Sequence, residues 1–227
     1  MIFNRARRGV VGAFCAMSLA ACSVLPKPEP VDVYMLPAST TPVTTGDSAQ
    51  RPWSLRIARP DANGQLVGQR ILVIPEPNRV SVYQGANWHE PASLLVRNRL
   101  FDAFRADGRV SALSTDEMRT FADFELGSDL GAFHSEYRRD GAPPEVVIRL
   151  DVRLIETASR HIVASRAFVV REPATESAIP AVVAAFGVAA NRLAFDLVAW
   201  TISGADAARK KETTEAAEVL PVTPGAP

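Results

Sequence analysis

Cysteine is scarce in this chain of 227 residues. The two cysteines, Cys15 and Cys22, both lie close to the N-terminus, and no cysteine follows them. The remainder of the chain therefore forms no internal disulfide and offers no thiol for catalysis or metal binding. Its stability has to come from a hydrophobic core, and a domain of this size can bury about 70% of the surface that its unfolded chain exposes.

An excess of either charge is also absent, because 25 Lys and Arg residues balance 25 Asp and Glu residues. Nucleic-acid-binding domains usually carry a basic patch. The near-neutral composition therefore gives no indication of a nucleic-acid partner.

Long hydrophobic runs are missing as well. The uncharged run Gly9–Leu19 is far shorter than the roughly 20 residues that span a bilayer. Residues 178–202 come closest to a second run, but polar residues and a proline interrupt them: Pro180, Asn191, Arg192 and Asp196. We therefore expect no transmembrane helix in the mature protein.

The N-terminus has the layout of a bacterial lipoprotein export signal. Arg5, Arg7 and Arg8 precede the apolar run, and Leu19-Ala20-Ala21-Cys22 follows it. An ordinary secretory signal also ends in small residues, but here a thiol that can carry a thioether-linked lipid stands next to them. We predict that residues 1–21 are cleaved and that Cys22 becomes the acylated first residue.

This prediction sets the compartment of the mature protein. Several acyl chains give stable membrane anchoring, whereas one chain binds only marginally. Ser23 after the cysteine is compatible with transfer to the outer membrane, so we expect a lipid anchor on its periplasmic side. Loss of three arginines and no acidic residue leaves 22 basic and 25 acidic side chains, a net charge of −3.

Composition divides the mature chain into three parts. Residues 22–52 are rich in Pro, Ser and Thr and predict an extended tether, interrupted by an alternating apolar segment over 31–36 that suits a short edge strand. Residues 53–204 form the predicted domain. Residues 205–227 have almost no large apolar side chains and are expected to be a disordered tail.

Hydrophobic periodicity predicts an α+β domain. Alternating strands are expected over 54–58, 69–74, 79–83, 110–113, 124–137, 146–154 and 162–170. One helix is expected between Pro91 and Gly108, and a longer one from Ser177 to Gly204. This order indicates a two-layer domain with a largely antiparallel sheet and two principal helices on one face.

Motifs that carry chemistry are not found. The sequence contains no phosphate-binding loop, no dinucleotide fingerprint and no nucleophile elbow. His89, His134 and His161 are far apart and fit no metal-ligand spacing. Asp151 alternates with two arginines on one strand face, which favours cross-strand ion pairs over catalysis. We therefore predict a protein that is not an enzyme and has no metal or cofactor.

One aromatic segment offers a candidate surface. Tyr83 and Trp88 lie in Tyr83–Pro91, between a strand and the first helix. They could dock a partner, or they could cover the sheet and fix the position of the helix. Trp200 on the second helix is expected in the core.

Taken together, these segments resemble the ABC-type transport auxiliary lipoproteins, a component of MCE-type (mammalian-cell-entry-like) and paraquat-inducible-type intermembrane transport systems. The resemblance covers nearly the whole mature chain, and the segments that carry it are the lipobox, Tyr34–Pro37, Tyr83–Trp88, Leu100, Gly108–Val110, Ala164–Phe168, Val183–Phe186 and Ala199–Trp200.

The resemblance implies a non-catalytic accessory role in (phospho)lipid transport. Its implied partners are an MCE-type periplasmic protein, an ABC permease and an ATPase, with the lipoprotein docking the conduit at the outer membrane. The long helix and open strand edges would also permit a homo-oligomer. A lipoprotein that assists lipopolysaccharide export or activates a cell-wall synthase remains the alternative.

Overall fold

The computed structural model describes residues 30–38, 49–118, 120–138 and 141–219. Cys22 and the signal sequence lie outside the described residues. The chain divides into two units, of which the second begins at Asp32 and contains the sheet and both helices.

The sheet is organised around its longest central strand, β7 (Phe124–Glu136). Along one edge, β7 pairs over its whole length with antiparallel β8 (Glu145–Glu156), which pairs in turn with antiparallel β9 (His161–Pro173). The register of β7 and β8 shifts between Leu130 and Ala132. This irregularity falls at Gly131.

The other edge of β7 is shared by three short parallel strands placed one after another. They are β2 (Leu55–Ile57), β3 (Asp61–Ala62) and β4 (Arg70–Glu76). A short 3-10 helix, η2 (Gly64–Val67), joins β3 to β4. β7 therefore connects the long hairpins on one side to the N-terminal half of the domain on the other.

Three further strands complete the sheet. β5 (Arg79–Trp88) pairs antiparallel with β4, and β1 (Asp32–Tyr34) pairs parallel with β5. β6 (Leu113–Thr115) pairs parallel with β2 and leads into the 3-10 turn η3 (Asp116–Met118).

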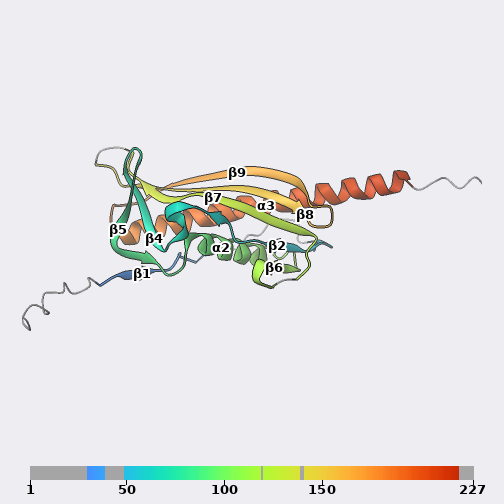
Figure 1. Cartoon of the computed structure of the whole chain (residues 1–227), viewed down its shortest axis with the longest axis horizontal. Helices are drawn as coiled ribbons and strands as arrows, with labels where there is room; N and C mark the ends of the chain where they lie inside the picture. The colour runs from blue at the N-terminus through green and yellow to red at the C-terminus, as the bar shows by residue number, and fades with distance from the viewer. Residues whose placement is uncertain (1–29, 39–48, 119, 139–140, 220–227) are drawn as a thin grey trace, which may run out of the picture. The chain divides into compact units, whose positions relative to one another are not determined.

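The expectation of a largely antiparallel sheet is wrong. Among the described residues, five of the eight strand pairings are parallel and the sheet is mixed. Alternation in a sequence shows that one strand face is buried, but it carries no information about the direction of the neighbouring strand. The expected α+β class with two principal helices is confirmed, and the sheet curls around these helices (Figure 1).

The first helix, α2 (Ala92–Asp107), begins and ends where the sequence predicts. Pro91 occupies the N-cap position, and Gly108 has a φ of 75°. Its amide donates to the carbonyl of Phe104 at 3.2 Å. Glycine adopts this left-handed conformation without a Cβ penalty, which explains the stop.

The second helix, α3 (Ile179–Val219), is 41 residues long and runs beyond the ends of β8 and β9 (Figure 1). The predicted end at Gly204 is wrong, and residues 205–219 of the expected disordered tail are helical. A Cβ at position 204 would lie 3.3 Å from the Leu154 side chain. The glycine therefore allows α3 to approach the sheet closely, at a helix-propensity cost of only about 1 kcal/mol.

Side chains beyond Gly204 are held by the domain. Ala205 is buried. Asp206 accepts hydrogen bonds from Arg51 Nε at 2.8 Å and from Trp53 Nε1 at 2.9 Å. The packed part of α3 therefore continues past the predicted domain boundary.

The core fills the space between the sheet and the helices. Its aromatic centre consists of Trp88, Phe133 and Phe186, which come from β5, β7 and α3. At the other end, Trp53 packs edge-on against Phe124 with ring centroids 5.5 Å apart. The predicted edge strand in the tether is confirmed as β1, so the folded unit includes residues before position 53.

Candidate partner-binding surfaces

Trp88 does not lie on a surface. It is 1% exposed, and its ring packs edge-on against Phe133 and Phe186 at centroid distances of 5.7 and 5.1 Å. The docking role predicted for Trp88 does not fit this position. The segment expected to be a connection is the end of β5, and strand alternation turns Trp88 into the core.

Tyr83 is half-buried on the same strand. Its hydroxyl lies 2.9 Å from the Ser135 hydroxyl of β7, and Ser135 is fully buried. Burial raises the pKa of Tyr83 to about 12, which the Ser135 hydrogen bond partly opposes. The phenol is therefore neutral at physiological pH, and its docking role stays a prediction.

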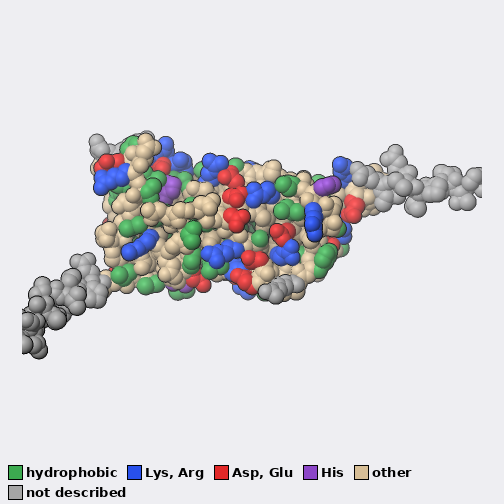
Figure 2. Space-filling model, viewed as in Figure 1, with side chains coloured by type: hydrophobic (Ala, Val, Ile, Leu, Met, Phe, Trp, Pro, Cys, Tyr) green, Lys and Arg blue, Asp and Glu red, His purple; other side chains and the backbone are tan. Residues whose placement is uncertain are grey.

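The outer face of the long hairpins carries paired charges. Arg149 binds Asp151 at 3.1 Å, and Arg153 binds Asp129 across the strands at 2.6 Å. Figure 2 shows basic and acidic side chains interleaved on this side of the molecule. Asp151 is ion-paired as predicted, but with Arg149 of its own strand rather than across strands.

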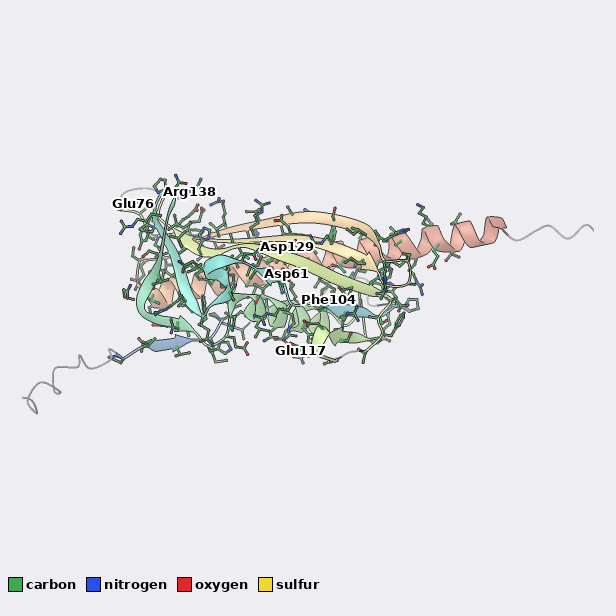
Figure 3. All side chains as sticks on the ribbon, viewed as in Figure 1. Asp61, Glu76, Phe104, Glu117, Asp129 and Arg138 are labelled. Atoms are coloured by element: carbon green, nitrogen blue, oxygen red, sulfur yellow. The ribbon has the colours of Figure 1, made fainter. Side chains whose placement is uncertain are left out.

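A denser ionic cluster lies where β7, β8 and β9 approach the β4–β5 turn. Arg171 donates to Glu136 at 2.6 Å and to Glu145 at 2.9 Å, and Arg138 lies 3.3 Å from Glu145. Figure 3 places Arg138 at the same end of the sheet as Glu76. A cavity of about 520 Å³ beside the cluster is lined partly by Ala142, Pro143 and Ala174.

The pKa values in this cluster are shifted by burial and by neighbouring charges. Burial alone would raise the pKa of Glu136, but its hydrogen bond to Arg171 and the surrounding positive charges outweigh this effect and lower the pKa. Burial lowers the pKa of His134, and the nearby Glu136 carboxylate only partly opposes that change. His134 is thus held neutral, with Nε2 3.6 Å from the Glu136 carboxylate.

We expect the melting temperature to fall as the pH drops below 6.5, the ordinary pKa of histidine. Because the folded-state pKa of His134 is lowered, the unfolded chain takes up the proton first and gains stability relative to the fold. His134→Gln should remove much of this slope between pH 7.5 and 5.5, as measured by thermal unfolding. The lowered pKa of Glu136 predicts a separate loss of stability below pH 4.5, the ordinary pKa of a glutamate side chain. An unchanged slope in His134→Gln would contradict the assignment.

The described residues contain no group of three or more His, Cys, Asp or Glu side chains that could hold a metal ion. His134 and His161 stand at opposite ends of the β7–β9 hairpins in the strand register. His89 directly follows β5, where its amide donates to Tyr34. The structure does not bring the three histidines together.

A groove of about 750 Å³ lies between the β8–β9 turn and the C-terminal half of α3. Its apolar part includes Ile162, Trp200 and Ala208, and charged side chains line it as well: Glu156, Lys211 and Glu212. Trp200 packs edge-on against Phe168 and is half-buried rather than fully in the core. No local signal could reveal this groove, because Ile162 and Trp200 are far apart in the sequence.

By length and composition, residues Ile179–Thr214 of α3 could cross a membrane, contrary to the sequence expectation. However, 67% of the most apolar window of this helix is buried inside the folded unit. This burial is typical of a core helix, and the buried side chains of α3 share one core with those of β8, β9 and α2.

These features define an α+β domain whose described residues offer a groove, charged faces and open strand edges for binding. A family model for the ABC-type transport auxiliary lipoprotein component matches residues 34–198. The chain therefore belongs to this family, which confirms the resemblance found in the sequence.

One relative and two solved structures are similar to this chain. An uncharacterized protein of Bradyrhizobium diazoefficiens is 31% identical over 164 residues, which cover 71% of this chain but 43% of that relative. A crystal structure of a Xanthomonas campestris protein is 29% identical, with a TM-score of 0.72 over 79% of this chain and 99% of the other. A second, uncharacterized protein shares the fold at 15% identity, with a TM-score of 0.58 over 75% and 97% of the two chains.

Proposed function

We propose that this chain is a non-catalytic, lipid-anchored accessory component of an ABC/MCE-type intermembrane (phospho)lipid transport system. Acylated Cys22 would hold it on the periplasmic side of the outer membrane, where the domain docks the periplasmic conduit. The family match over residues 34–198 carries this proposal.

The surface chemistry supports an accessory role. The groove beside α3 combines apolar side chains with charged ones, as protein-binding surfaces do. The sequence has no nucleotide-binding motif, so ATP hydrolysis would belong to the partner ATPase. An MCE-type protein, an ABC permease and this ATPase are the expected partners.

Mild crosslinking of the membrane-anchored protein, followed by purification and mass spectrometry, tests the proposal. We expect an MCE-type protein together with its permease and ATPase. A photo-crosslinking residue at Ile162 in the groove or at Tyr83 would locate the contact, with Arg149 on the charged outer face as the matched control position.

The alternative function predicts a different set of partners. Recovery of an outer-membrane barrel for lipopolysaccharide export, or of a peptidoglycan synthase, would refute the transport role. It would leave the anchor and the fold unaffected.

A further inference from the structure

The segment before the main domain is firmly attached to it. We call residues 32–38 the N-terminal strap. Its strand β1 pairs with the end of β5, with Tyr34 opposite Trp88. The His89 amide donates to the Tyr34 carbonyl at 2.9 Å, and Tyr34 and Leu36 pack against the core.

Two residues on the helices hold the end of the strap. Arg99 of α2 is 8% exposed, and its guanidinium donates to the Pro37 carbonyl and to Asn191 of α3. Pro37 lies over Gly187 of α3, where a Cβ would come within 2.9 Å of the proline ring. The strap is thus fixed to both helices and to the sheet.

This attachment shortens the tether. The linker expected over residues 22–52 could reach on the order of 100 Å at about 3.3 Å per residue. Asp32 at the start of β1 is only ten residues further along the chain than Cys22, and ten extended residues reach at most about 35 Å. A lipid on Cys22 therefore keeps β1 within that distance of the membrane.

The strap also presents large apolar side chains to the outside. Val33 is 63% exposed and Met35 is 70% exposed. The alternate residues, Tyr34 and Leu36, pack inward against the core. β1 is the last strand on its side of the sheet, and residues 33–38 contain no charged side chain. Exposed apolar groups on an edge strand are usually avoided unless something covers them.

We propose that the outer side of β1, with Val33 and Met35, rests against the bilayer that holds the lipid of Cys22. The short tether keeps this apolar side of β1 close to the bilayer. We therefore assign the lipid surface as its partner. This inference rests on the proposed anchor at Cys22. The domain would lie on the membrane with β1 facing it and β9, the opposite edge strand, facing away.

The test uses the full-length acylated protein in phosphatidylethanolamine/phosphatidylglycerol vesicles. A polarity-sensitive fluorophore is attached to Met35→Cys, or to Val169→Cys as the matched control. Val169 is similarly exposed at 54% and lies on β9, which Figure 1 shows on the other side of the helices from β1. Acylation consumes the Cys22 thiol, so each variant carries one reactive cysteine.

We expect the Met35→Cys label to shift its emission to shorter wavelength and to be quenched by spin-labelled lipid, while the Val169→Cys label stays water-like. Equal, water-like emission from both labels in protein that floats with the vesicles would overturn the inference and leave the anchor intact. Protein that does not float would refute the anchor at Cys22, and the inference with it.

Two further labels identify which face of the domain meets the bilayer. Gln84 is exposed on β5, two residues before Ala86, the first β5 residue that pairs with β1. A Gln84→Cys label should also be quenched, because the docked strap brings this part of β5 to the bilayer surface. Quenching of the Met35→Cys label without quenching of the Gln84→Cys label would show that the strap detaches from the domain. That result would overturn the inference. Quenching confined to Phe121→Cys, the 75% exposed aromatic after η3, would assign the membrane to another face.

Discussion

Trp88→Ala is expected to destabilise the domain by about 3–5 kcal/mol, the range for removing a large buried aromatic side chain. The indole is 1% exposed and lies between Phe133 of β7 and Phe186 of α3. Edge-on aromatic pairs add about 0.5–1.5 kcal/mol each beyond the burial of their area. Urea unfolding followed by circular dichroism measures the loss as a lower midpoint.

Tyr83→Phe serves as the matched control on the same strand. It removes only the hydroxyl that meets Ser135, so we expect a cost of about 1 kcal/mol. If Trp88→Ala instead unfolded at the wild-type urea concentration but lost its co-purifying partners, Trp88 would be a docking residue and its burial would be wrong. The pair of variants thus separates a packing role from a binding role within one strand.

Features that depend on local chemistry could be predicted from the sequence. Alternation over residues 146–154 predicted β8, and a left-handed glycine at position 108 ended α2 as expected. The edge strand β1 was also predicted, from a short alternating segment between prolines. In each case the signal lies within a few residues of the element that it specifies.

Features that depend on distant partners could not be predicted. Gly204 was expected to end the helix, because glycine is common at C-termini. Only the position of Leu154 on β8 shows that this glycine serves close packing. The prediction of strand directions was wrong for the same reason. β2, β3 and β4 pair in parallel with one edge of β7, and no local sequence pattern indicates this pairing.

The candidate surfaces also depend partly on local sequence and partly on distant partners. Tyr83 and Trp88 were chosen because two aromatics lie in one short polar segment, but strand alternation places the second of them in the core. The groove beside α3 joins Ile162 to Trp200 through the fold alone. Arg99 and Gly187 hold the strap in place. Neither residue stands out in the sequence, so this attachment could not be predicted.

Cys22→Ser is expected to abolish acylation completely, because a hydroxyl cannot form the thioether that carries the lipid. Anchoring then fails, since each buried CH₂ contributes about 0.8 kcal/mol and stable attachment needs more than one chain. Incorporation of an alkyne-labelled fatty acid, read on a gel, measures the loss directly. With the chain exported behind an ordinary cleavable signal, the variant should move from the membrane fraction to the periplasmic fraction.

Cys15→Ser is the matched control, because Cys15 lies within the predicted signal peptide and leaves with it. It should incorporate fatty acid as the unsubstituted chain does. Label that persists in Cys22→Ser would contradict the predicted anchor. It would also remove the ten-residue limit that places β1 near the bilayer, because that limit is counted from Cys22. The position of the lipid therefore decides both where the protein resides and which of its faces meets the membrane.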